Sequence, residues 1–197
     1  MHGMVDDLQA DTTILKSTLF SLNRLVERFD SLQQDLQSFD KEENIRAHYY
    51  MASLIIATMD FTATKRTSEQ LRNTGYYRLI RNKDLLDSLV YYDTRIRKAE
   101  DYWQTQRLQE RNELMNLQSK VFDVGQIRKI RDARQLNKDT AILIRSLPII
   151  SADKELMNEY YNKMVNYRYA CFNQAFLHQR LIDKAVSLIN FIKKEYN

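Results

Sequence analysis

Apolar residues recur with a heptad spacing through the first part of the chain. One position of the repeat is occupied by Val5, Thr12, Leu19, Val26 and Gln33, and the other by Leu8, Leu15, Leu22, Phe29 and Leu36. Because an α-helix turns once every 3.6 residues, a seven-residue repeat places both sets on one side of a helix. The pattern predicts a single long helix over residues 5–36 that packs along other helices at a shallow angle.

A possible N-terminal capping box follows this helix. Asp40 with Glu43 has the required three-residue spacing and predicts a second helix over residues 41–60. The side chains expected to be buried on it are Ile45, Ala52, Ile55, Ile56 and Met59.

A shorter helix is predicted next. Thr67 with Gln70 again has the form of a capping box, and Gly75 fits the glycine that follows a helix end. Asn82 can cap the start of the helix after it. We therefore expect a short helix between Thr67 and Gly75.

Residues 83–122 contain neither glycine nor proline and predict another long helix. Its apolar positions are Leu85, Leu89, Tyr92, Ile96, Ala99, Trp103, Leu114, Leu117 and Val121. Gly125 is expected to end this helix. One or two shorter helices are predicted over 126–147, where Pro148 closes the region.

The last helix is expected to begin at Ser151 or Asp153 and to run to about Lys194. Its predicted buried face comprises Leu156, Tyr160, Met164, Tyr167, Cys171, Phe172, Ala175, Phe176, Leu181, Ile182, Ala185, Leu188, Ile189 and Ile192. Three long helices with shorter ones between them predict an all-α fold, an elongated antiparallel helical bundle. We expect residues 4–197 to form a single domain and residues 1–3 to be a cloning remnant.

Composition supports this fold class. The 197 residues include only 3 glycines and 1 proline, too few for the turns of a sandwich, barrel or doubly wound sheet. The lone Cys171 excludes an internal disulfide and is predicted to be a buried core residue. The longest apolar runs fall far short of the roughly 20 residues that span a bilayer.

Candidate catalytic and metal-binding motifs are scarce. The residues three positions before His48 and His178 are Ile45 and Ala175, so the Glu-x-x-His motif of di-iron bundles does not occur. The glycines are isolated from one another, which excludes a phosphate-binding loop. We expect no catalytic residue, no metal and no cofactor, and predict that the protein is not an enzyme.

Adjacent tyrosines recur along the chain and invite a ligand-binding interpretation. The more general expectation is that one tyrosine of each helical pair faces the core, while its neighbour, about 100° round the helix, lies at the rim. A ligand or partner site is best supported near the Gly75 turn, where polar and aromatic groups cluster. The residues proposed for it are Gly75, Tyr76, Tyr77, Arg78, Arg81, Tyr91 and Tyr92.

The net charge of +4 is concentrated in two segments. One is 65–81; the other, 124–145, contains a candidate basic surface formed by Arg128, Lys129, Arg131, Arg134 and Lys138. A helix could align several of these side chains against phosphates. Since the whole chain is almost balanced in charge, we expect no nucleic acid. A solvated connector, or a patch for anionic lipid headgroups or an acidic partner, is favoured.

Residues 67–85 resemble the signature of an uncharacterised family of single-pass membrane-anchored helical proteins of Gram-negative bacteria. The matching residues are Glu69, Leu71, Thr74, Gly75, Leu79, Ile80, Asn82 and Leu85, with Asp7, Leu8, Asp11, Leu15, Asp30, Ser31 and Leu32 upstream and the pair Tyr91 and Tyr92 downstream. The resemblance implies an N-terminal membrane anchor, missing here, and a domain held in the periplasm at the inner membrane.

Three functions remain open at this point. The leading hypothesis is a non-enzymatic interaction or sensing domain that binds a protein partner or a second copy of itself. The second is a structural spacer or oligomerisation module, because the heptad over 5–36 could pair between chains. The third is a small-molecule binding or enzymatic site near the Gly75 turn.

Overall fold

The computed structural model describes residues 2–35, 42–55, 61–136, 138 and 153–196. Over these residues the chain is all-α, as predicted, and has no β-strand. The elements are α1 (His2–Asp35), α2 (Glu42–Ile55), α3 (Arg66–Asn73), the 3₁₀-helix η1 (Tyr76–Leu79), α4 (Lys83–Tyr102), the π-helix η2 (Trp103–Arg107), α5 (Leu108–Val121), α6 (Val124–Gln135) and α7 (Lys154–Tyr196).

The chain divides into two compact units. Unit 1 comprises Met1–Leu22, Met59–Gln104 and Asn173–Asn197, and unit 2 comprises Asn23–Thr58 and Thr105–Phe172. The expectation of one domain over 4–197 stays a prediction.

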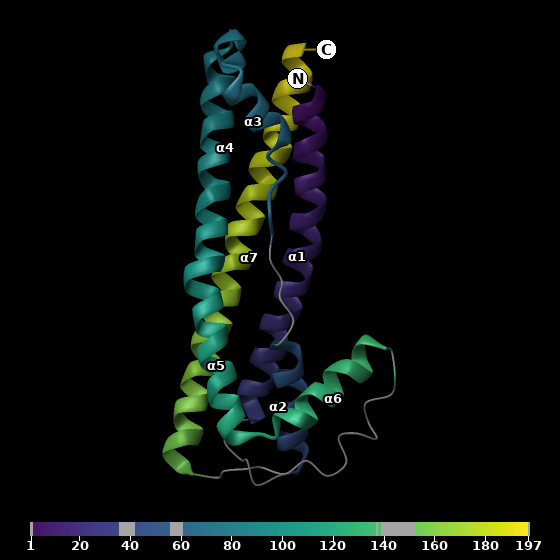
Figure 1. Cartoon of the computed structure of the whole chain (residues 1–197), viewed down its shortest axis with the longest axis vertical. Helices are drawn as coiled ribbons and strands as arrows, with labels where there is room; N and C mark the ends of the chain where they lie inside the picture. Colours follow the sequence, from purple (N-terminus) through teal and green to yellow (C-terminus); the bar gives the residue numbers. More distant parts are fainter. Residues whose placement is uncertain (1, 36–41, 56–60, 137, 139–152, 197) are drawn as a thin grey trace. The chain divides into compact units, whose positions relative to one another are not determined.

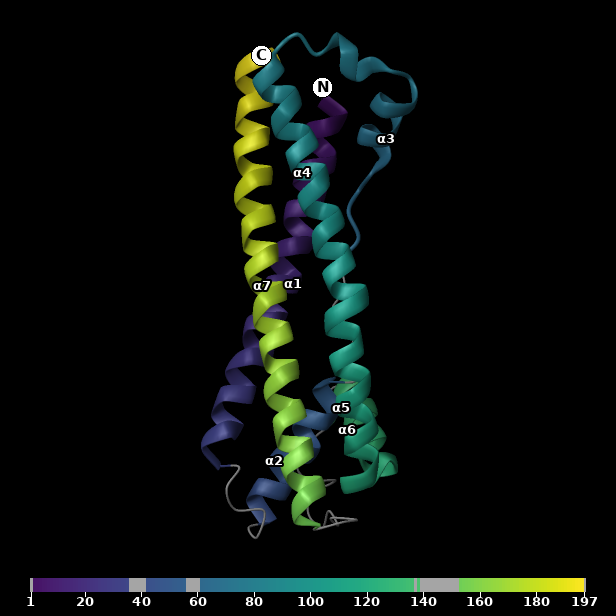
Figure 2. The same cartoon turned by 90° about the vertical axis from the view of Figure 1, so that its left-hand side faces the viewer.

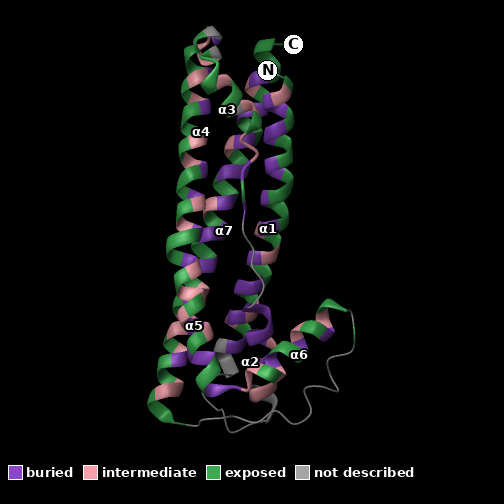
Figure 3. Cartoon of the chain, viewed as in Figure 1, coloured by how far each residue is buried: buried purple, intermediate pink, exposed green. Residues whose placement is uncertain are grey.

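In unit 1, the first part of α1, all of α4 and the last part of α7 run side by side (Figures 1 and 2). The first turn of α1 and the last turn of α7 lie at the same end of this unit. The buried faces of the three helices turn toward one another (Figure 3). Their shared core includes Leu8, Leu15, Leu85, Leu89, Leu181 and Leu188. This packing explains why helix-spaced apolar residues are needed on all three.

In unit 2, α2 packs against α5 and α6. The buried side chains of unit 2 include Tyr49, Ile55, Leu114, Phe122, Ile130 and Tyr160. Cys171 is buried in α7, as predicted, and burial raises the pKa of its thiol. Among the described residues, no helix is both long enough and apolar enough to cross a membrane.

Several predicted helix boundaries are confirmed. The Asn82 side chain accepts a hydrogen bond from the Leu85 amide at 3.1 Å and caps α4. Asp153 accepts from the Leu156 amide at 2.8 Å and caps α7. Gly75 follows α3 with φ 71°, in the left-handed region where a glycine has no steric cost.

Other predicted boundaries are wrong. Gly125 does not end the helix before it: α5 ends at Val121, and Gly125 lies in the first turn of α6, which Asp123 caps by accepting from the Gly125 amide at 2.7 Å. The stretch 83–122 is not one regular α-helix, because η2 separates α4 from α5. The Thr67–Gln70 capping box does not form, since α3 already begins at Arg66 without a cap from its own side chains.

Burial also corrects the face predicted for α7. Phe172 and Phe176 are exposed, although they were expected in the core. Cys171 and Ala175, predicted for the same face, are buried, and the next residue along the helix is rotated by about 100° away from them. The predictions that involve Leu36, Asp40, Ile56, Met59, Pro148, Ser151 and the rest of 139–152 lie outside the described residues.

Candidate functional site

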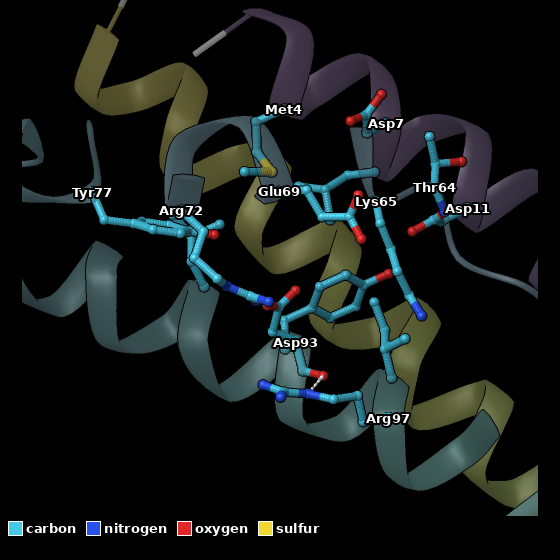
Figure 4. A pocket seen from close by; sticks show the side chains of 14 residues that line it. Met4, Asp7, Asp11, Thr64, Lys65, Glu69, Arg72, Tyr77, Asp93 and Arg97 are labelled. Carbon is cyan, nitrogen blue, oxygen red and sulfur yellow. Dashed lines mark hydrogen bonds and ion pairs between the residues drawn. The ribbon is translucent and has the colours of Figure 1, made fainter. Parts of the chain in front are cut away.

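Two carboxylates of α1 are buried one helical turn apart in unit 1. Asp7 is 3% exposed and Asp11 is 2% exposed. Because residues four apart lie on the same helix face, both side chains point the same way, toward the segment that leads into α3. Figure 4 shows them beside side chains from this segment, from α3 and from α4.

These carboxylates anchor the segment at the start of α3. Asp7 accepts a hydrogen bond from the Thr67 amide at 2.8 Å and from the Arg66 guanidinium at 3.0 Å. Asp11 accepts from the Thr64 amide at 2.7 Å. Asp7 therefore satisfies an amide in the first turn of α3, the role usually filled by a capping side chain within the helix's own sequence.

A third carboxylate holds the same segment from α4. Glu100 accepts from the Ala63 amide at 3.3 Å and from the Lys65 ammonium at 2.7 Å. Three acidic side chains from two helices thus fix residues 63–67 against α1 and α4 within unit 1, and this placement forms one wall of a cavity.

Replacing Asp7 with alanine is expected to lower the free energy of unfolding by about 1.5–3 kcal/mol, because hydrogen bonds to a charged group contribute about that much. Urea denaturation measures the change, and hydrogen exchange should show faster exchange of the α3 amides. Asp6→Ala is the matched control, since Asp6 is the exposed neighbour in the same helix turn. Equal losses in the two variants would contradict the anchoring role.

The cavity has a volume of about 160 Å³ and lies among α1, α3, η1 and α4 (Figure 4). Its apolar wall is formed by Met4, Leu8, Leu89 and Ile96. Its polar lining is formed by Asp7, Asp11, Thr64, Lys65, Glu69, Arg72, Tyr77, Tyr92, Asp93 and Arg97. Polar residues are therefore the majority of the lining, whereas most small-molecule sites are lined mainly by apolar side chains.

Most of the charges around the cavity are paired. Arg72 forms an ion pair with Asp93, in addition to the pairs Arg66–Asp7 and Lys65–Glu100. Asp11, by contrast, has no ion-pair partner among the described residues. Burial raises the pKa of Asp11 and the charge of nearby Asp7 raises it further, while hydrogen bonds from Thr64 and Tyr92 oppose this rise. A buried carboxylate without a cation is uncommon.

The Tyr92 hydroxyl lies next to this carboxylate. Tyr92 is 4% exposed, and its hydroxyl interacts with the Asp11 carboxylate. Burial raises the pKa of Tyr92, and the negative charge of Asp11 raises it further. The Asp11 carboxylate, which has no cationic partner among the described residues, and the Tyr92 hydroxyl therefore face the same cavity.

The structure brings only some of the residues of the predicted site near Gly75 together. Tyr77 and Tyr92 line the cavity, and burial raises the pKa of the half-buried Tyr77. Tyr91 lies on a different face of α4, in a separate groove. Gly75, Arg78 and Arg81 are exposed and line neither hollow, and nothing is described of the Tyr76 side chain.

The tyrosine pairs follow the expected division between core and rim. Tyr92 is buried and Tyr91 exposed, and Tyr160 is buried while Tyr161 is half-buried. The key cavity residues Asp7, Asp11 and Arg97 were not predicted as site residues. The sequence feature that could have indicated them is the four-residue spacing of Asp7 and Asp11 beside the apolar positions of the first helix.

The candidate basic surface lies in unit 2. Arg128 and Lys129 of α6 are exposed, while Arg131 pairs with Asp132 at 2.9 Å. Arg134 donates to the Ser53 hydroxyl at 3.2 Å. Lys138 lies beyond the end of α6, so a single helix does not align all five basic side chains.

His48 and His178 are both buried in ring contacts. His48 stacks on Phe122, with ring centroids 5.9 Å apart, and its Nδ1 lies 3.4 Å from the Tyr160 hydroxyl. His178 meets the Phe61 ring edge-on at 5.7 Å. In the described ranges, no three His, Cys, Asp or Glu side chains are grouped closely enough to hold a metal ion.

No protein-family model matches this chain, and no curated protein or solved structure matches it at a significant level.

Proposed function

We propose that this chain is a non-enzymatic sensing domain whose cavity in unit 1 binds a compact organic ammonium ion. The observation that carries the proposal is the unpaired Asp11 carboxylate beside the Tyr92 hydroxyl, both buried and both lining the cavity. A primary ammonium group has three N–H donors and a positive charge. It would neutralise the buried Asp11 carboxylate and donate a hydrogen bond to the Tyr92 hydroxyl oxygen.

The surroundings favour an organic cation over a bare metal ion. A metal ion such as Mg²⁺ or Ca²⁺ takes about six or more oxygen ligands, whereas the lining carboxylates Asp7 and Asp93 are already paired with Arg66 and Arg72. The rings of Tyr77 and Tyr92 attract cations through their faces. Met4 and Leu8 offer apolar surface to a short carbon chain.

The size of the cavity limits the ligand. Its volume of about 160 Å³ is below the roughly 300–1,000 Å³ of sites for drug-sized molecules. We therefore infer a small amine. Arg97, at the same cavity, donates weakly to the Asp93 carbonyl at 3.5 Å and could meet an anionic end of such a ligand.

The cellular setting is a further part of the proposal. The resemblance of residues 67–85 supports a domain in the periplasm, attached to the inner membrane through a segment before Met4. A protein partner or a second copy of the chain would then receive the signal. We also propose that the long helices form one elongated antiparallel bundle, which the heptad over 5–36 supports.

The ligand proposal is tested with butylammonium and its neutral analogue 1-butanol at constant ionic strength. We expect saturable changes in the amide resonances of residues 63–67 and 92–97 with butylammonium, and none with 1-butanol. Asp11→Asn should weaken binding at least about tenfold, while Asp6→Asn, which removes the same charge from the exposed face of α1, should not.

Tyr92→Phe separates binding from folding. The variant keeps the buried ring and loses only the hydroxyl, so binding should weaken while the loss of stability stays within about 1.5 kcal/mol, the usual contribution of one hydrogen bond. Butylammonium binding that survives both Asp11→Asn and Tyr92→Phe unchanged would overturn the proposed function, as would equal binding of 1-butanol.

A further inference from the structure

A second hollow of unit 1 lies between α4 and α7. This α4–α7 groove has a volume of about 310 Å³ and is lined by Tyr91 and Arg95 from α4 and by Leu177, Arg180, Leu181 and Lys184 from α7. Its volume falls at the lower end of the range of small-molecule sites, roughly 300–1,000 Å³.

Two cations from different helices converge on one tyrosine ring in this groove. The Arg95 guanidinium lies 4.9 Å from the centroid of the Tyr91 ring and its Nε donates to the Tyr91 hydroxyl at 2.8 Å. The Lys184 ammonium lies 5.5 Å from the same centroid. The ring attracts both cations without neutralising either, so their charges remain available.

The lining of the groove carries more positive than negative charge. None of Arg95, Arg180 and Lys184 forms an ion pair within the described part of the chain. The one carboxylate of the lining, Asp183, accepts a hydrogen bond from the side-chain amide of Gln179 at 2.8 Å. The three cations repel one another, and one carboxylate offsets only part of this repulsion. A bound anion would reduce it further.

The apolar residues of the lining indicate which group the ligand carries besides its charge. Leu177 and Leu181 lie at i and i+4 of α7 and provide apolar surface beside the cations. We propose that the α4–α7 groove binds a small organic anion, a phosphate monoester or carboxylate that carries a compact apolar or aromatic group. The anionic end would lie among Arg95, Arg180 and Lys184, and the apolar end against the leucines.

This site is independent of the amine cavity, because it shares no lining residue with it. Its probe is phenyl phosphate, compared with benzyl alcohol and with inorganic phosphate, in amide-resonance titrations of the wild-type chain. We expect saturable shifts for residues 88–95 and 177–187 with phenyl phosphate, at least about fivefold weaker binding of inorganic phosphate, and no saturable binding of benzyl alcohol. Raising the ionic strength should weaken phenyl phosphate binding.

Two groove variants and one matched control decide the result. Lys184→Glu and Arg95→Gln should each weaken phenyl phosphate binding at least about tenfold, whereas Lys16→Glu, on the exposed face of α1, should change it less than about twofold. Equal weakening by Lys16→Glu would show that only net charge matters and would overturn the proposal. Inorganic phosphate that binds as tightly as phenyl phosphate, or benzyl alcohol that binds as tightly, would overturn it too.

Discussion

Replacing Phe122 with alanine is expected to lower the free energy of unfolding of unit 2 by about 3–5 kcal/mol, the usual cost of removing a buried phenyl ring. Phe122 is 0% exposed. Its ring centroid lies 5.0 Å from that of Tyr49 and 5.4 Å from that of Tyr160, and it also stacks on His48. Urea denaturation followed by circular dichroism measures the loss.

Phe172→Ala is the matched control, because Phe172 belongs to the same unit and is 48% exposed. Its expected change is within about 0.5 kcal/mol. If Phe172→Ala is as destabilising as Phe122→Ala, the assignment of Phe122 to the centre of the unit 2 core is wrong.

Acidification is expected to destabilise the chain through His48, by up to about 3 kcal/mol between pH 7 and pH 4. Burial lowers the pKa of His48 from 6.5 to about 4 in the folded chain. Below pH 6.5 the unfolded chain therefore binds a proton that the folded chain excludes. Stability is complete above that pH and falls as the pH drops toward 4.

His48→Gln isolates this contribution, because glutamine is polar and does not titrate. The free energy of unfolding of the wild type and of this variant is measured by urea denaturation at several pH values. We expect a flatter decline between pH 6.5 and pH 4 in the variant, while changes due to carboxylates are common to both. Parallel curves over that range would show that His48 is not held neutral by the fold.

The sequence predicted helix boundaries correctly where they are set by contacts between neighbouring residues. Asn82 and Asp153 cap the helices that directly follow them, and Gly75 has the positive φ expected after a short helix. These contacts join residues at most a few positions apart, so spacing alone reveals them. The same reasoning placed Gly125 wrongly, because its cap partner Asp123 starts a new helix there.

The candidate site was predicted only in part, because its parts come together through tertiary contacts. Tyr77 and Tyr92 could be proposed as ligand residues from their position near Gly75. The role of Asp7 and Asp11 depends on residues 63–67 lying against α1, more than fifty positions later in the chain. No local pattern carries that information.

The spacing of apolar residues by itself determined that this chain is all-α and where most helices run, because helix periodicity and caps are properties of neighbouring residues. Only the tertiary structure decided which polar side chains became buried together. The free energy of a carboxylate or hydroxyl depends on what surrounds it. For Asp11 and Tyr92 those surroundings are assembled from α1, α4 and the segment before α3.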